Sequence, residues 1–144
     1  MRKHFGQRGQ QGFTMVEVML AVVIIGIIAA VSMPIYKESV QRSGRNQARS
    51  VLLEDMAWLE RNNTTNNTYL ISGKAPDLPF KQSPKNGAAK YNITITDVTA
   101  STFTLLATPL SGVDDKCGTF KIDQTGLKTI QGGSLSVDEC WNGK

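Results

Sequence analysis

The chain has 144 residues, 19% of them charged, and its formal net charge is +4 at pH 7. That length leaves room for one membrane segment and one modest soluble domain. With one histidine and two cysteines, the chain lacks the four Cys/His ligands of a structural zinc site. It also has no histidine base in a catalytic constellation and no glycine-rich phosphate loop. We therefore expect no enzyme activity, no cofactor and no metal site.

The stretch from Gly12 to Tyr36 dominates the sequence. Residues 18–36 carry no charge and are rich in Val, Ile, Leu, Met and Ala, close to the roughly 20 apolar residues that cross a bilayer core as a helix. Two features do not suit a simple anchor. Glu17 lies at the mouth of the apolar run, where a carboxylate costs energy. Residues 1–12 form a short basic leader that ends in glycine directly before Phe13.

These residues carry a family resemblance. The run Gly12–Glu17, GFTMVE, followed by the apolar segment and Pro34, resembles the class III signal of type IV prepilins. In that family a membrane peptidase cuts after the glycine, and the new N-terminal residue is methylated. The resemblance implies cleavage between Gly12 and Phe13, methylation of Phe13 and an assembly role for Glu17. Gly26 and Pro34 match the positions where the family's helix loosens or bends.

The same resemblance divides the chain into three parts: a removed leader (1–12), a transmembrane and assembly half of the helix (13–36) and a globular pilin domain (37–144). Basic residues beside an apolar helix stay on the cytoplasmic side, and the leader carries Arg2, Lys3 and Arg8. We expect a single-pass inner-membrane protein with a periplasmic domain, which later joins an extracellular filament of a Gram-negative bacterium. Removing the leader, which also contains His4, takes away three basic residues and lowers the net charge from +4 to +1.

Both cysteines, Cys117 and Cys140, lie on the translocated side of the segment. An even pair in an oxidising compartment forms a disulfide. We therefore predict a Cys117–Cys140 bond that ties the C-terminal tail, 132–144, to the body of the domain.

The helix should continue beyond the membrane segment to about Arg61 and end in the Asn/Thr-rich stretch 62–68. Pro34 removes one backbone hydrogen bond and should kink it. In the second half, apolar residues recur at helical spacing and predict one buried stripe: Val40, Ala48, Leu52, Met56 and Leu59. The charged residues of this half are expected mainly elsewhere: Arg42, Arg45, Arg49, Glu54 and Glu60.

After an irregular connection over residues 72–88, period-2 alternation and turn residues predict four short strands. They cover 91–96, 102–108, 117–122 and 127–130, with a hairpin at Asp123–Gly126. Tight links favour an antiparallel sheet, whose apolar face is covered by the helix stripe. The predicted class is α+β. It resembles the type IV pilin fold, a long helical spine packed on a four-stranded antiparallel sheet with a disulfide-closed C-terminal region.

The C-terminal third resembles the minor pilins of the type IVa system. The residues concerned are Asp114, Cys117, Gly118, Thr119, Phe120, Gly126, Cys140 and Trp141. We expect Trp141 to pack at the disulfide. The resemblance implies a structural minor pilin whose partners are other pilin subunits, a prepilin peptidase, the inner-membrane assembly platform and the membrane itself. Such a subunit contributes to adhesion, twitching motility or DNA uptake.

Two alternatives remain open. Some minor pilins act as DNA receptors in transformation, and lysines cluster in the connection and the sheet: Lys74, Lys81, Lys85, Lys90, Lys116, Lys121 and Lys128. Phosphate contacts need such charges, but no aromatic residues alternate with these lysines for base stacking. The second alternative is a pseudopilin of a type II secretion system, for which a calcium site would be typical. The acidic pairs Asp114-Asp115 and Asp138-Glu139 are better interpreted as solvated carboxylates than as a calcium site.

Overall fold

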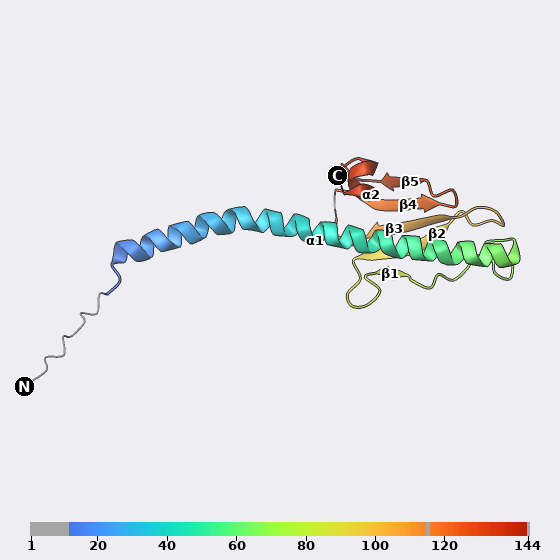
Figure 1. The fold of residues 1–144 in the computed structure, drawn as a ribbon, viewed down its shortest axis with the longest axis horizontal. Helices are drawn as coiled ribbons and strands as arrows, with labels where there is room; N and C mark the ends of the chain where they lie inside the picture. Colours follow the sequence, from blue (N-terminus) through green and yellow to red (C-terminus); the bar gives the residue numbers. More distant parts are fainter. Residues whose placement is uncertain (1–11, 115, 144) are drawn as a thin grey trace, which may run out of the picture. The chain divides into compact units, whose positions relative to one another are not determined.

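The computed structural model describes residues 12–114 and 116–143 (Figure 1). The predictions for Arg2, Lys3, His4, Arg8 and Asp115 lie outside the described residues. The chain divides into two compact units at the bond between Lys37 and Glu38. The first unit contains the apolar half of the long helix. The second unit contains the amphipathic half and the sheet.

The helix α1 (Met15–Asn66) has 52 residues and includes Pro34. It continues further into the Asn/Thr-rich stretch than predicted. The side chains of Thr64, Thr65 and Asn66 donate to backbone carbonyls one turn back, at 2.8, 3.1 and 3.2 Å. These side chains therefore bond along the helix instead of interrupting it. Asn67 then takes a φ of 52°, the left-handed conformation in which helices often end.

The second unit contains one antiparallel sheet with the strand order β1-β2-β3-β4-β5. The strands are β1 (Gln82–Ser83), β2 (Tyr91–Thr96), β3 (Thr104–Pro109), β4 (Thr119–Asp123) and β5 (Lys128–Gln131). The four predicted strands are confirmed, with boundaries that move by a residue or two. The difference is β1, a short fifth strand inside the stretch expected to be irregular. It pairs Gln82 with Asn92 and Ser83 with Tyr91.

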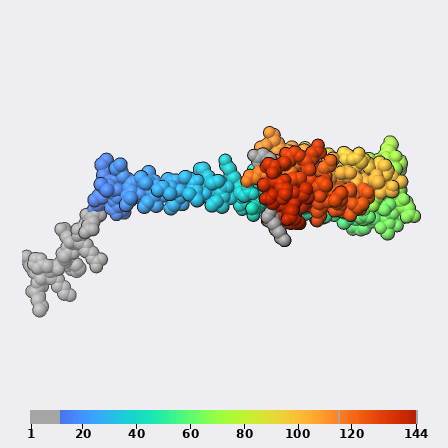
Figure 2. Space-filling view, turned by 90° about the horizontal axis from the view of Figure 1, so that it is seen from above, coloured from blue at the N-terminus to red at the C-terminus, as the bar shows by residue number. Residues whose placement is uncertain are grey.

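The second half of α1 lies across one face of this sheet (Figure 1). Its residues Ala48, Leu52 and Leu59 are fully buried. They form one apolar cluster with inward-facing sheet residues: Tyr91, Ile93, Leu105, Ala107, Phe120 and Ile122. In the space-filling view, the strands and the C-terminal segment pack closely together (Figure 2). All of these core residues belong to the second unit, so a fragment that begins at Lys37 keeps every contact of the core.

The predicted stripe on α1 is correct for four of its members and wrong for Val40. Met56 is partly buried against the core, but the side chain of Val40 is 39% exposed because it lies before the first covered turn. The prediction that charged residues avoid the stripe fails at Arg45, which is 4% exposed. Asp55, also charged, is fully buried. Both occupy core positions, but only Arg45 has a charged partner, described below. Asp55 accepts one bond, from the backbone N–H of Phe80 to Oδ1 at 3.3 Å, and its Oδ2 has no partner among the described residues.

The C-terminal tail contains a short helix, α2 (Val137–Asn142), which the sequence interpretation missed. Ser136 caps it, since its hydroxyl accepts a bond from the backbone N–H of Glu139 while the Glu139 carboxylate accepts from the backbone N–H of Ser136. This reciprocal arrangement is a capping box. Gly143, with a φ of 71°, ends the helix. The tail is thereby folded back onto β5.

Candidate functional site

The predicted processing junction lies just before α1. Gly12, Phe13 and Thr14 precede the helix, which begins at Met15. The Thr14 hydroxyl accepts a bond from the backbone N–H of Glu17 at 3.3 Å, so Thr14 acts as the N-cap. Glu17 lies in the first turn, where a carboxylate is favoured by the helix dipole. Glu17 therefore has a local helical role besides the assembly role implied by the resemblance.

The helical segment that follows is apolar on all sides. Among residues 13–36, the large apolar side chains are between 49% exposed, at Ile24, and 85% exposed, at Met15. The segment is long and apolar enough to cross a membrane. Gly26 has no neighbouring atom within 4 Å of the position that a Cβ would take. The loosening predicted at Gly26 and the kink predicted at Pro34 stay predictions.

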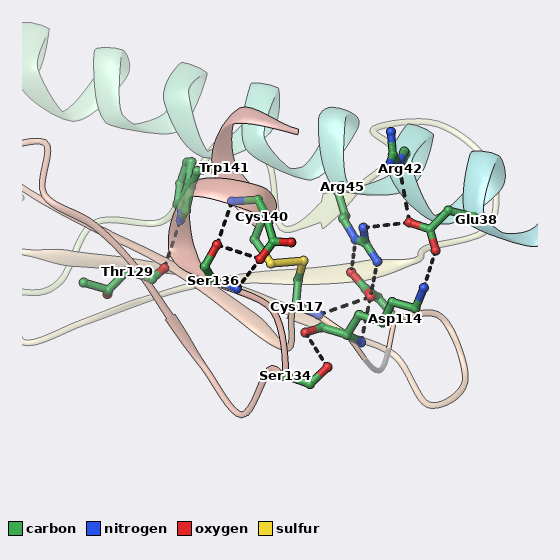
Figure 3. Close-up of a disulfide and its surroundings, with 12 residues drawn as sticks. Glu38, Arg42, Arg45, Asp114, Cys117, Thr129, Ser134, Ser136, Cys140 and Trp141 are labelled. Carbon is green, nitrogen blue, oxygen red and sulfur yellow. Dashed lines mark hydrogen bonds and ion pairs between the residues drawn. A yellow bond between two sulfur atoms is a disulfide. The ribbon is translucent and has the colours of Figure 1, made fainter. Parts of the chain in front are cut away.

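A buried ion pair joins α1 to the loop before β4 in the second unit (Figure 3). The Arg45 guanidinium donates from Nε to Asp114 Oδ2 at 2.7 Å and from a terminal nitrogen to Oδ1 at 2.9 Å. The Tyr91 hydroxyl donates to Asp114 Oδ2 at 2.9 Å, and the backbone N–H of Lys116 donates to Oδ1 at 3.1 Å. Such a two-pronged geometry suits Arg and carboxylate groups. It explains how a charge at position 45 is accommodated in the core.

The pKa values in this cluster follow from its geometry. Burial alone raises the pKa of Asp114, but the hydrogen bonds from Arg45 and Tyr91 outweigh burial and hold that pKa below its usual range. The hydrogen bond to Asp114 raises the pKa of Arg45. Burial, followed by the negative charge of Asp114, raises the pKa of Tyr91. At neutral pH the cluster therefore contains a carboxylate, a guanidinium and a neutral phenol.

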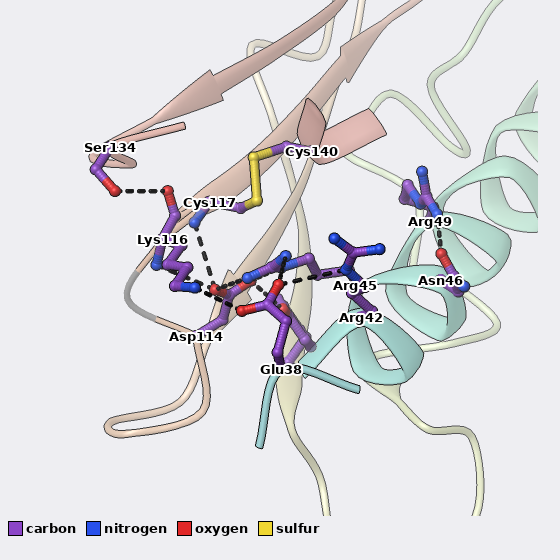
Figure 4. A network of polar contacts seen from close by, with 11 residues as sticks. Glu38, Arg42, Arg45, Asn46, Arg49, Asp114, Lys116, Cys117, Ser134 and Cys140 are labelled. Atoms are coloured by element: carbon purple, nitrogen blue, oxygen red, sulfur yellow. Dashed lines mark hydrogen bonds and ion pairs between the residues drawn. A yellow bond between two sulfur atoms is a disulfide. The ribbon is translucent and has the colours of Figure 1, made fainter. Parts of the chain in front are cut away.

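A partly exposed shell surrounds the buried pair (Figure 4). The Glu38 carboxylate accepts bonds from Lys116 at 2.5 Å, Arg42 at 3.4 Å and Arg45 at 3.5 Å. The bond from Lys116, followed by the smaller effects of the two arginines, lowers the pKa of Glu38. The start of α1 in the second unit is thereby fixed to the loop at Asp114.

The predicted disulfide is present. Cys117 and Cys140 are bonded, with their Cα atoms 5.7 Å apart, and the bond joins the loop before β4 to α2. Cys117 is three residues after Asp114, and its backbone N–H points to Asp114 Oδ1 at 3.4 Å. The ion pair and the disulfide therefore form a continuous connection from α1 to the C-terminal tail.

Trp141 lies beside the disulfide, as predicted for a packing residue. Its ring meets that of Phe120 edge to face, with centroids 5.4 Å apart. Its indole N–H donates to the backbone carbonyl of Thr129 on β5 at 3.0 Å. A bond to a backbone group of β5 covers part of that edge strand. Trp141 is 5% exposed, so it offers no surface for stacking a ligand.

The acidic residues considered for calcium are engaged elsewhere. Asp114 is saturated by Arg45, Tyr91 and backbone N–H groups, and Glu139 closes the capping box of α2. In the described ranges, 12–114 and 116–143, no group of three or more His, Cys, Asp or Glu side chains is placed to hold a metal ion.

The lysines divide into two groups. Lys81, Lys85 and Lys116 pair with Asp77, Glu54 and Glu38. Lys121 donates to the Gln131 side chain, and Lys128 lies over the Trp141 ring. Within the part of the chain that the structure describes, the lysines that pair with no carboxylate are Lys37, Lys74, Lys90, Lys121 and Lys128.

Comparisons with known proteins identify the family. A family model described as type IV minor pilin ComP, DNA uptake sequence receptor, matches residues 34–121. The prokaryotic N-terminal methylation motif matches residues 7–33, which include the predicted junction and Glu17. The chain belongs to the type IV pilin family. Its domain is thus similar to that of ComP, and its N-terminus carries a methylation motif.

Individual relatives of this pilin agree with that assignment. It is 31% identical over 93 residues to the type IV major alpha-pilin of Moraxella bovis, an alignment that covers 65% of this chain and 52% of that protein. It is 30% identical over 107 residues to a fimbrial protein of Pseudomonas aeruginosa, covering 70% of this chain and 69% of that one. The aligned part thus spans about half the length of the Moraxella protein.

Two solved structures are also similar to the pilin. A type IV pilin from Shewanella oneidensis has a TM-score of 0.47 and 24% identity, with 67% of this chain and 98% of that chain covered. The minor pilin PilV of Neisseria meningitidis has a TM-score of 0.48 and 19% identity, with 67% and 92% covered.

Family membership sets the coarse role of the pilin. It is a type IV pilin whose N-terminal helix is long and apolar enough to cross a membrane. The predicted fold class is confirmed, with five strands instead of four.

The sequence interpretation missed the Arg45–Asp114 pair and the buried Asp55. A usable signal existed, since 45, 48, 52, 55 and 59 are spaced by three and four residues and share one helix face. Charged residues on an apolar helix face indicate buried partners.

Proposed function

We propose that this pilin is a minor subunit of a type IV pilus, cut by a prepilin peptidase after Gly12, methylated on Phe13 and assembled through the segment 13–36. One observation carries the proposal. The segment lies at the matched methylation motif, and its large apolar side chains are 49–85% exposed within the chain. Such a surface needs lipid before assembly and the helices of neighbouring subunits afterwards.

The orientation in the membrane is part of the proposal. The basic leader stays in the cytoplasm, which places the second unit in the periplasm of a Gram-negative cell, with extraction by the inner-membrane assembly platform to follow. The Cys117–Cys140 disulfide supports this direction, because such bonds form and persist in oxidising compartments.

Glu17 acts as a registration residue in this proposal. Cleavage after Gly12 frees the α-amino group of Phe13, which stays cationic after methylation. The Glu17 carboxylate of a neighbouring subunit neutralises that amine among apolar helices, where an unpaired charge is strongly penalised. The pair then fixes the axial displacement of one subunit's helix relative to the next, and contributes less to the net stability of the filament.

The test separates this role from the local role of Glu17 in α1. In cells that lack the native gene, Glu17→Ala is expected to be cleaved normally and to be absent from sheared pili. Thr14→Ala is the matched control, because it removes the hydroxyl that caps the backbone of Glu17 but keeps the carboxylate. It is expected to enter pili normally. Incorporation of Glu17→Ala at the wild-type level would contradict the pairing.

DNA binding by the second unit is the second candidate function. It is favoured by one observation, the match of residues 34–121 to the family of a DNA uptake sequence receptor. Phosphate contacts need cations that are available. Lys74 and Lys90, both in the segment between α1 and β2, pair with no carboxylate in the described residues, whereas Lys81 is held by Asp77 at 2.7 Å.

A mobility-shift titration tests this candidate with the fragment that begins at Lys37 and a double-stranded DNA of defined sequence. We expect binding that weakens steeply with salt, because phosphate contacts release counterions. The double variant Lys74→Ala/Lys90→Ala should bind less tightly, while Lys81→Ala should bind about as well as the wild type. No shift at low salt would refute DNA binding and leave the pilus-subunit proposal standing.

A further inference from the structure

The segment between β1 and β2 carries an Asn-Gly pair, Asn86-Gly87. Residues 85–88 are exposed, and they form neither helix nor strand. Asn86 also lines an open hollow in the second unit, which Ser50 and Val51 of α1 line as well. Solvent therefore reaches the side-chain amide of Asn86 and the backbone beside it.

An Asn-Gly pair is chemically labile because the backbone nitrogen of the glycine can attack the side-chain carbonyl carbon of the asparagine. The attack closes a five-membered ring, so only residues adjacent in the chain can take part. Glycine has no Cβ to shield its nitrogen, and its backbone reaches conformations closed to other residues. Both reacting groups must be free, since a hydrogen bond at either one holds the chain away from the geometry of the ring.

Both reacting groups are free at Asn86-Gly87. The amide of Asn86 and the backbone N–H of Gly87 make no hydrogen bond with the described residues. Gly87 has a φ of 90°, and apart from its chain neighbours no atom lies within 4 Å of the position that a Cβ would take. Its carbonyl accepts from the Gln82 side chain at 3.3 Å. The loop is therefore braced at that carbonyl, while the Gly87 nitrogen stays unbonded.

The second Asn-Gly pair of the chain, Asn142-Gly143, is held at both groups. The Asn142 amide donates to the Asp138 carboxylate. The backbone N–H of Gly143 donates to the Glu139 carbonyl at 3.1 Å and so closes the last turn of α2. The two pairs share the same chemistry and differ in structure, so the fold should separate their rates of reaction.

We propose that Asn86 is a site of spontaneous deamidation in the folded pilin. The Gly87 nitrogen forms a bond to Cγ of Asn86, the Cγ–Nδ2 bond breaks, and Nδ2 leaves as ammonia with the proton lost from Gly87. Water then opens the cyclic imide. Addition at Cγ gives aspartate and addition at the backbone carbonyl carbon gives isoaspartate, with a water proton returned to the Gly87 nitrogen. The sum converts an amide and one water into a carboxylic acid and ammonia, with no oxidation or reduction.

The product carries a negative charge where the chain had a neutral amide, because an aspartyl carboxyl is ionised at neutral pH. That charge adjoins Lys85, whose ammonium pairs with Glu54, and it lowers the formal net charge of the subunit by one. Isoaspartate also lengthens the backbone inside the loop that Gln82 braces. The loop thus becomes more acidic as a chain ages. The inference goes beyond the proposed function and does not depend on pilus assembly or on DNA.

The test uses the full chain in detergent micelles, incubated in a mildly alkaline buffer whose water is labelled with heavy oxygen. Peptide mapping by mass spectrometry follows the label, which marks only the conversions that occur during incubation. Isoaspartate is counted by enzymatic methylation of its free carboxyl group. We expect labelled aspartate and isoaspartate at Asn86, formed at least about tenfold faster than at Asn142, where the bonds that close α2 must first open.

Urea provides the internal control, because unfolding frees both pairs. The rates at Asn86 and Asn142 should then come within a few-fold of each other. Conversion at Asn86 that is no faster than at Asn142 in the folded chain would overturn the proposal, and so would aspartate formed without isoaspartate. A rate difference that persisted unchanged in urea would assign it to the neighbouring sequence and contradict the role given to the fold.

Two matched variants identify the attacking nitrogen. Gly87→Ala adds a Cβ beside that nitrogen and should slow conversion at Asn86 severalfold. Gly143→Ala is the control, since it is the same exchange at a glycine that also has a positive φ, 71°, and it should leave the rate at Asn86 unchanged. The same comparison in urea removes any strain from alanine at a positive φ. A rate at Asn86 that Gly87→Ala leaves at the wild-type value in urea would overturn the assignment.

Discussion

Removal of the Asp114 carboxylate is the sharpest test of how the second unit is held together. Asp114→Ala strands the Arg45 guanidinium, whose side chain is 5% exposed, and also removes the acceptor of the Tyr91 hydroxyl. Breaking one side of a buried pair costs about 3–5 kcal/mol. For a domain of about 100 residues, that loss lowers the thermal midpoint by roughly 12–20 °C.

The assay is thermal unfolding of the fragment that begins at Lys37, followed by circular dichroism with the disulfide intact. Asp77→Ala is the control. It breaks the ion pair between Asp77 and Lys81, in which the Asp77 side chain is 84% exposed and the Lys81 side chain 65%. Loss of so exposed a pair should change the free energy of unfolding by less than about 0.5 kcal/mol.

A double-mutant cycle measures the coupling between Arg45 and Asp114. Arg45→Met alone should also be destabilising, whereas Arg45→Met/Asp114→Ala should cost less than the sum of the single variants, by about 1–3 kcal/mol. The double variant no longer contains a stranded charge. Additive effects, or equal losses for Asp114→Ala and Asp77→Ala, would refute the claim that a desolvated pair fastens α1 to the sheet.

Three further predictions concern other parts of the domain. Burial raises the pKa of Asp55 to about 6, so its contribution to stability falls as pH rises from 4 to 6. Asp55→Asn should therefore gain up to about 3 kcal/mol relative to the wild type between pH 4 and 7 in urea titrations, and a constant difference would contradict this. Gly133→Ala places a Cβ 2.5 Å from the Cys117 carbonyl oxygen and should destabilise by about 1–3 kcal/mol in the same titrations, so an unchanged stability would contradict this close approach. Cys140→Ser opens the loop that the disulfide closes and should cost about 3 kcal/mol, measured against the wild type with and without reductant; equal stabilities would contradict it.

The sequence was informative wherever one simple pattern governs the structure. Alternation in Tyr91–Thr96 predicted β2 and its buried face, because a strand places successive side chains on opposite sides. The Asp123–Gly126 turn predicted the hairpin, in which the Asp123 carboxylate accepts from the backbone N–H groups of Thr125 and Leu127. The local sequence is enough to form these two elements, so each can be predicted without knowledge of the rest of the chain.

The rest depends on partners that are distant in the chain. Arg45 and Asp114 are 69 residues apart, and nothing local indicates that one neutralises the other. Strand β1 exists because Gln82 and Ser83 lie next to β2, although their own sequence is typical of a loop. By contrast, α2 could have been predicted from the sequence although it was missed, since Ser136 and Glu139 have the spacing of a capping box.

The central claim is that one cut after Gly12 releases an apolar helix whose new amine takes part in assembly. Intact-mass and N-terminal peptide mass spectrometry of sheared pili and of the membrane fraction test it most directly. We expect the chain in both fractions to begin at Phe13 and to carry one added methyl group on its amine. A chain that still carries its first twelve residues in both fractions would contradict the account.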